Sequence, residues 1–149
     1  MKTLLPLLIS ATVLAGCAST AQNGEATIRK DIAVCMEAVK RSDLIAVQVP
    51  VADNAISHKI AVASLGIGGS LTVDTLIQML SKPTRPAIAV VGENDEMSAA
   101  TLETALKKLP ENSQRSRAAV CFAGHKKFEA DLRIAAEKAG VNLVLAPNR

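Results

Sequence analysis

The sequence predicts a small three-layer α/β domain with a mostly parallel sheet of four or five strands and flanking helices. Short aliphatic runs alternate with longer amphipathic stretches along the chain. Apolar runs without polar alternation are typical of strands that are covered on both faces. Strands that alternate with helices of about 10 to 14 residues indicate right-handed β-α-β units. An apolar content of 49% in 149 residues is enough for one core.

The first half of the chain contributes a helix, a strand and an ambiguous segment. Residues 25–41 repeat apolar side chains at helical spacing. Residues 44–51 are rich in β-branched side chains and predict a strand that ends near Pro50. Residues 54–65 fit a single helix, whereas 59–65 alone fit a strand, and the periodicity does not decide between the two.

The second half follows a regular alternation. Helices are expected at 72–81, 98–109 and 126–139, and strands at 87–91, 118–122 and 141–145. The first of these helices is expected to bury Val73, Ile77 and Leu80. Ser98 is the expected N-cap of the second, and Gly140 is expected to end the third. No internal repeat and no second domain are indicated.

The first twenty residues have the layout of a secretory signal. Lys2 supplies a positive start, and residues 4–14 form an apolar run. This run is shorter than the roughly 20 residues that a membrane-spanning helix needs. The tetrapeptide LAGC at 14–17 then resembles the lipobox of bacterial lipoprotein precursors. The resemblance implies cleavage directly before Cys17, a diacylglycerol on its sulfur and usually an acyl chain such as palmitate on its amino group.

The same resemblance implies a domain organisation and a location. Residues 1–16 would be removed, 17–24 would form a lipidated tether of at most roughly 25 Å, and 25–149 would form one α/β domain. By resemblance to Gram-negative lipoproteins, Ala18 instead of Asp after the cysteine implies anchoring in the outer membrane, facing the periplasm. The alternative is a cytosolic domain whose N-terminal helix is buried, with Cys17 as a core residue.

Two further cysteines, Cys35 and Cys121, remain once Cys17 carries lipid. An even pair in an oxidising compartment favours a disulfide. Both lie in apolar surroundings, so two buried free thiols fit the sequence equally well. A catalytic thiol is disfavoured, because neither cysteine has a histidine beside it in the sequence.

Composition argues against nucleic-acid and glycan binding. The formal net charge of the chain is only +3, and loss of Lys2 with the signal lowers it further. A net charge this close to zero gives no electrostatic reason to bind nucleic acid. The chain has no Trp and no Tyr, whereas base and sugar stacking both rely on aromatic faces.

Three loops are expected at the carboxyl edge of the sheet, where open α/β folds bind ligands. The glycine loop at 66–70 can present backbone N–H groups to an anion, although it is neither a dinucleotide fingerprint nor a Walker loop. The acidic loop at 92–96 suits a divalent cation, or simply complements a helix dipole. The loop at 123–127 offers a histidine as acid, base or ligand. The candidate ligand residues are Gly66, Gly68, Gly69, Ser70, Glu93, Asp95 and His125.

The sequence lacks the signatures of zinc, thiol-redox and serine-hydrolase sites, so we expect no catalytic set, cofactor or metal. Two functional hypotheses follow. The first is a non-enzymatic, membrane-anchored envelope lipoprotein that binds a protein partner, as an assembly factor, secretion accessory or immunity-type inhibitor. The second is a small-anion-binding protein or hydrolase that uses the three loops. The strong anchor and the absence of catalytic signatures favour the first.

Overall fold

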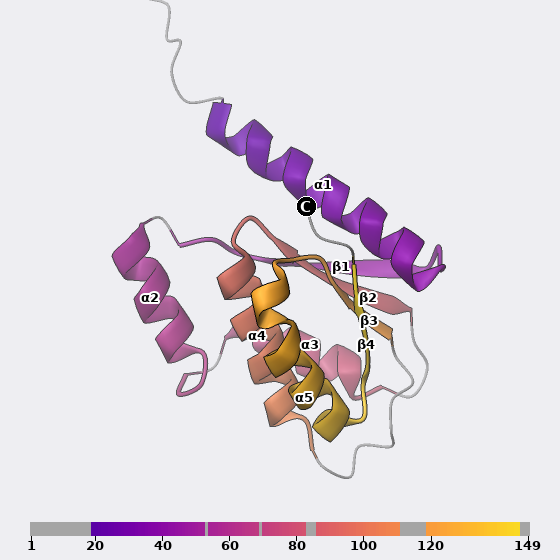
Figure 1. Cartoon of the computed structure of the whole chain (residues 1–149). Helices are drawn as coiled ribbons and strands as arrows, with labels where there is room; N and C mark the ends of the chain where they lie inside the picture. Colours follow the sequence, from indigo (N-terminus) through magenta and orange to yellow (C-terminus); the bar gives the residue numbers. More distant parts are fainter. Residues whose placement is uncertain (1–18, 53, 69, 83–85, 111–118, 147–149) are drawn as a thin grey trace, which may run out of the picture.

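The sheet at the centre of the domain has four parallel strands, which confirms the predicted α/β class (Figure 1). The computed structural model describes residues 19–146, apart from 53, 69, 83–85 and 111–118. The signal segment, the lipobox and Gly69 therefore lie outside the described residues. The strands are β1 (Leu44–Val49), β2 (Ala87–Gly92), β3 (Ala119–Phe122) and β4 (Asn142–Leu145).

The strands are arranged in the sheet in the same order as in the chain. Successive right-handed crossovers in one direction place every connecting helix on the same face. The other face is covered by the N-terminal helix, which precedes β1, so the domain has three layers (Figure 1). The helices are α1 (Ser19–Val39), α2 (Ala55–Ser64), α3 (Leu71–Leu80), α4 (Asp95–Lys108) and α5 (Glu129–Ala139), with the short 3-10 helix η1 (Lys126–Phe128) before α5.

Alternate residues of each strand point into two separate cores. The core beneath α3, α4 and α5 holds the large side chains, among them Leu76, Leu102, Phe122 and Leu132. The core beneath α1 is built largely from small side chains of the sheet, which allow the helix to approach the strands closely. Its buried members are Cys35, Ala89, Val91, Cys121, Ala123 and Ala146. Within the part of the chain that the structure describes, no helix is long and apolar enough to span a membrane.

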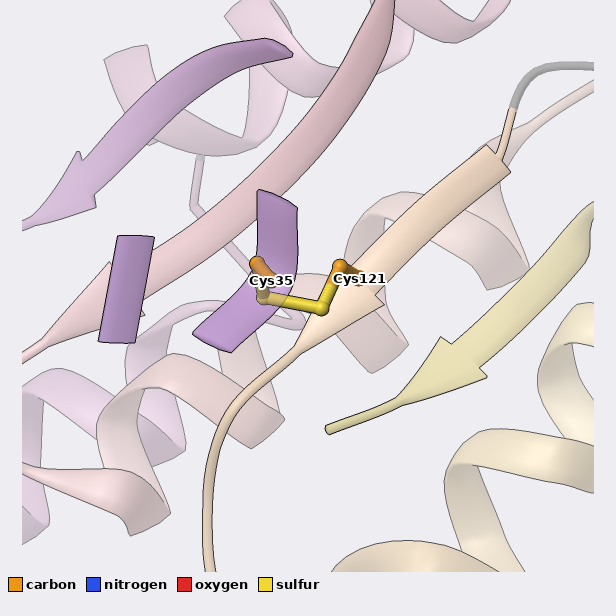
Figure 2. Close-up of a disulfide and its surroundings, with 2 residues drawn as sticks. All are labelled: Cys35 and Cys121. Atoms are coloured by element: carbon orange, nitrogen blue, oxygen red, sulfur yellow. A yellow bond between two sulfur atoms is a disulfide. The ribbon is translucent and has the colours of Figure 1, made fainter. Parts of the chain in front are cut away.

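A disulfide joins α1 to the sheet (Figure 2). The Sγ atoms of Cys35 and Cys121 are 2.04 Å apart, and their Cα atoms are 5.7 Å apart. Both residues are fully buried. Of the two arrangements that the sequence left open, the paired one is therefore the one present.

The end of α1 is fixed as well. Lys40 leaves the helix with φ 55°, in the left-handed region, which turns the chain back toward β1. Arg41 Nε and Nη2 then donate hydrogen bonds of 2.8 and 2.6 Å to the two carboxylate oxygens of Asp43. These bonds favour the charged carboxylate and lower the pKa of Asp43.

The helix expected at 25–41 begins earlier than predicted, within the expected tether. α1 begins at Ser19, so residues 19–24 belong to a helix and not to an extended linker. Once a helix is nucleated, each further residue adds a hydrogen bond at little extra cost, and this segment contains no proline. The apolar stripe of residues 28–39 that packs on the sheet supplies the nucleus.

Two details of the helices also differ from expectation. α4 begins at Asp95, and Asn94 is its N-cap, with Oδ1 accepting a hydrogen bond of 3.0 Å from Met97 N. The predicted cap, Ser98, is instead buried within the helix. In α3 the buried residues are Val73, Leu76 and Leu80, whereas Ile77 is only partly buried.

The ambiguous segment 54–65 is a helix. Asn54 caps α2, and its Oδ1 accepts hydrogen bonds from Ile56 N and Ser57 N at 3.1 and 2.9 Å. The remaining predicted elements are confirmed with small shifts of their ends. Gly140 ends α5 in the left-handed conformation that favours glycine, with φ 68°.

Removal of the disulfide should destabilise the domain strongly. It links residues 86 positions apart, and for a loop of that length the chain-entropy model gives a loss of about 4 kcal/mol in the free energy of unfolding. We expect this loss for the double variant Cys35→Ala/Cys121→Ala in urea denaturation. The reduced wild-type protein is the control and should lose a similar amount. A difference below about 1 kcal/mol would contradict the expected role of the cross-link.

The two candidate caps of α4 can be distinguished by substitution. Asn94→Ala removes an N-cap hydrogen bond and should lower the free energy of unfolding by about 1 kcal/mol. Ser98 Oγ is buried and has no hydrogen-bond partner among the described residues. Ser98→Ala should therefore be neutral or stabilising, because it removes an unsatisfied buried hydroxyl. Thermal and urea unfolding of the two variants should rank them in this order, and the reverse order would restore Ser98 as the cap.

Candidate functional site

Two of the three predicted ligand loops meet at the carboxyl edge of the sheet. The backbone N–H of His125 donates a hydrogen bond of 2.9 Å to Asp95 Oδ2, which joins the loop after β3 to the start of α4. The imidazole of His125 faces its own chain, because its Nδ1 accepts a hydrogen bond of 3.2 Å from Lys127 N and caps η1. This nitrogen therefore has a structural role.

A cavity of about 180 Å³ lies beside His125, between η1, α5 and the ends of β3 and β4. Its basic side chains are those of His125, Lys126 and Arg133. Arg133 is already paired, since its Nη2 lies 2.7 Å from Glu129 Oε1. Neither Glu93 nor Asp95 lines this cavity. The acidic and histidine loops thus touch, but the acidic side chains do not line the cavity beside His125.

The glycine loop does not join them. Ser70 lines a different cavity, of about 320 Å³, together with Pro50, Val51 and Thr101. The backbone N–H groups of Ile67 and Gly68 donate to Ser64 O at 3.1 and 2.7 Å. These donors close the end of α2, so they do not point at a common anion site.

The three carboxylates of the acidic loop also have separate partners. Glu93 lies against Gly24 of α1, Asp95 holds the loop after β3, and Glu96 Oε2 lies 3.4 Å from the Nε2 of His58. The cation site that these residues suggested is therefore not formed. More generally, no group of three or more His, Cys, Asp or Glu side chains suited to a metal occurs among the described residues.

The most unusual surface of the domain lies on α2, where the sequence did not lead us to expect a site. Four large aliphatic side chains of α2, the turn after it and the start of α3 are exposed. They are Ile56, 74% exposed, Ile60, 64%, Ile67, 94%, and Leu71, 85%. We call this set the α2 stripe. Exposed aliphatic residues are common singly, but a run of this size along one segment is typical of an interaction surface.

The other face of α2 is also apolar and rests on the domain. Ala61, Val62 and Leu65 pack against the large core, and His58 lies beside α4. Ile56 and Ile60 are one helical turn apart, on the side opposite to these residues. No residue of α2, all of which are described, is fully buried. α2 is thus apolar on both faces, and the domain covers only one of them, as its outlying position shows (Figure 1).

Sequence reasoning missed the α2 stripe because periodicity reports that a face is apolar and not whether another element covers it. A usable signal was nevertheless present. The run from Ile60 to Leu65 contains no charged side chain and is apolar around the helix. Such a helix is expected to be buried on all sides. A second helix was expected in the same connection, at 72–81, so the two helices compete for cover by the sheet.

Comparisons with known proteins do not assign the domain: no family model, no curated protein and no solved structure matches the chain. The functional conclusion therefore depends on the surface and on the sequence features described above.

The α2 stripe should contribute little to folding. Ile60 is largely exposed, so Ile60→Glu should change the free energy of unfolding by less than about 0.5 kcal/mol. Leu65, which follows α2 and is buried in the core, is the matched control, and Leu65→Ala should cost about 2 kcal/mol or more. Urea denaturation measures both. A large loss for Ile60→Glu would mean that the stripe is covered within the domain.

Proposed function

We propose that this protein is a membrane-anchored envelope lipoprotein that acts as a non-enzymatic protein-interaction module. Lipid on Cys17 holds it at the membrane, in a Gram-negative cell at the outer membrane on the periplasmic side. The α2 stripe binds the partner. The lipobox supports the anchor, and the paired cysteines are consistent with an oxidising compartment.

The observation that carries the proposal is the second apolar face of α2. A stripe that is not needed for folding costs solubility unless another surface covers it. Ile56 and Ile60 are four residues apart on α2, the spacing with which helices contact an apolar groove or another helix, and Ile67 lies in the turn after α2. This arrangement suits a partner that lays one apolar helical face along α2.

Charge further specifies that partner. α2 carries Lys59 beside the stripe and contains no acidic residue. An amphipathic helix with an acidic side chain at the margin of its apolar face would complement it, because opposite charges at the rim of an interface favour association and set its orientation. We therefore assign to the α2 stripe a protein partner that presents such a helix.

The alternative function, a small-anion-binding protein or hydrolase, has less support. It requires the three loops to converge, but Ser70 and His125 line separate cavities. It also requires a free imidazole and free loop N–H groups, whereas His125 Nδ1 and the Gly68 N–H are used within the fold.

Site-specific photo-crosslinking tests the proposal. A photoreactive amino acid replaces Ile60 in the full-length, lipidated protein, and the crosslinked peptides are identified in envelope membranes. We expect one partner, crosslinked through an amphipathic helix with an acidic margin. The double variant Ile56→Glu/Ile60→Glu should reduce recovery of this partner at least about tenfold, as expected from burying two charges in an apolar contact.

Ile134 supplies the control, because it is an exposed aliphatic residue, 54% accessible, on α5. Ile134→Glu should leave recovery of the partner unchanged. Two results would contradict the proposal: a partner whose recovery is insensitive to both variants, or crosslinks only to a second copy of this chain. The second result would identify the α2 stripe as a dimer interface.

A further inference from the structure

α1 begins almost at the residue that is proposed to carry lipid. Cys17 precedes Ser19, the first residue of α1, by two positions, and two residues span at most about 7 Å. Residues 19–24 then add about 1.5 Å each, because they are helical. At Gly24 the helix reaches the domain, where it lies against the Glu93 carboxylate. The start of α1 therefore lies within about 8 Å, along the helix, of the residue that contacts the loop after β2, and the proposed lipid site is two residues before that start.

α1 cannot swing freely about this contact. The disulfide between Cys35 and Cys121 fastens its second half to β3. Ile28 and Ile32 pack on the core beneath the helix, and the Arg41–Asp43 pair lies in the turn that leads to β1. From Ser19 onward the helix is thus a rigid spacer.

The direction of α1 determines which end of the domain is near the anchor. Glu93 follows β2, so the loop that Gly24 contacts belongs to the carboxyl edge of the sheet. In Figure 1 the N-terminal part of α1 extends past the loop between β2 and α4, while the far end of α5 lies at the opposite end of the domain. The carboxyl edge is consequently the side that is turned toward the lipid.

The exposed side chains of this edge suit a phospholipid surface. Pro50 and Val51, which follow β1, are exposed. Lys126 and Lys127, which follow β3, are exposed cations. Aliphatic side chains enter the headgroup region, and lysines are attracted by anionic lipids. Glu93 and Glu96 of the same edge are also exposed, and Asp95 is held by His125 N. The edge therefore carries both charges, and the headgroup contact rests on Pro50, Val51 and the two lysines.

We infer that α1 holds the carboxyl edge of the sheet against the membrane, so that the loops after β1 and β3 contact phospholipid headgroups. This inference rests on the proposed lipidation of Cys17 and adds the orientation of the domain. It places the α2 stripe at the side of the domain, where it is accessible to a partner in the same membrane.

Headgroup quenching tests the orientation. The lipidated protein is reconstituted in vesicles of phosphatidylethanolamine and phosphatidylglycerol that contain a headgroup-linked nitroxide quencher. One fluorophore is attached at Lys126→Cys and, in a separate sample, at Lys138→Cys. Both lysines are exposed, and they lie near opposite ends of the η1–α5 segment. With Cys35 and Cys121 paired and Cys17 acylated, the introduced thiol is the single reactive one.

We expect quenching at position 126 to exceed that at 138 at least about twofold, because a helical segment of twelve residues separates them by roughly 18 Å. Equal quenching, or stronger quenching at 138, would overturn the inference. Insertion of a flexible Gly/Ser linker before Ser19 should abolish the difference by uncoupling α1 from the lipid. A difference that survives this insertion would overturn the role of α1 as a rigid spacer.

Vesicle flotation and the intact mass separate this inference from the proposed function. Protein that lacks the acyl mass on Cys17 and fails to float would contradict the anchor itself. Protein that floats with the acyl mass but shows no difference between the two labels would contradict only the orientation.

Discussion

The packing of α1 on the sheet is the contact on which the rest of the structure depends. Four parallel strands in chain order send all their connecting helices to one face. The other face must be covered by an element from outside the β-α-β series, because both faces of a parallel sheet are apolar. α1 supplies this cover, and its disulfide to β3 makes the cover permanent while the protein is oxidised.

Under the proposed function, the same contact links folding with attachment to the membrane. α1 covers the small core and directly follows the segment that resembles a lipobox. A helix that needed only to cover the sheet could begin near Ile28, where the buried stripe begins. This helix instead continues toward Ser19 and carries the proposed anchor past the carboxyl edge. These extra turns would be needed if the proposed partner binds only when the domain stands at a particular distance and angle from the membrane.

α2 illustrates a second consequence of the topology. The connection from β1 to β2 contains two helices, and α3 already covers the sheet beside α4. α2 therefore lies outside this layer, supported on one side by Ala61 and Val62 and open on the other at Ile56 and Ile60. A helix in this position can be remodelled for binding at little cost to the core, which is a common property of functional segments on a rigid scaffold.

The local sequence pattern was sufficient to predict the fold class and nearly every element. Continuous aliphatic runs such as 87–91 favour strands that are buried on both faces, and a glycine such as Gly140 favours the left-handed end of a helix. The pattern was insufficient for the start of α1, since helix propagation from a packed segment leaves no mark in residues 19–24. It was also insufficient for the candidate site, because the loops of Ser70 and His125 share an edge in the topology but not a cavity in space.

The sequence by itself determined where most strands and helices form, apart from segment 54–65 and the start of α1, and its lipobox-like tetrapeptide led to the expectation of a lipid anchor. Both depend on contiguous residues, whose chemistry is legible without a fold. Only the tertiary structure decided that Cys35 meets Cys121, that the glycine loop stands apart from the acidic loop, and that one apolar face of α2 is left open. These are relations between segments distant in the chain, and they arise from how the helices share the two faces of the sheet.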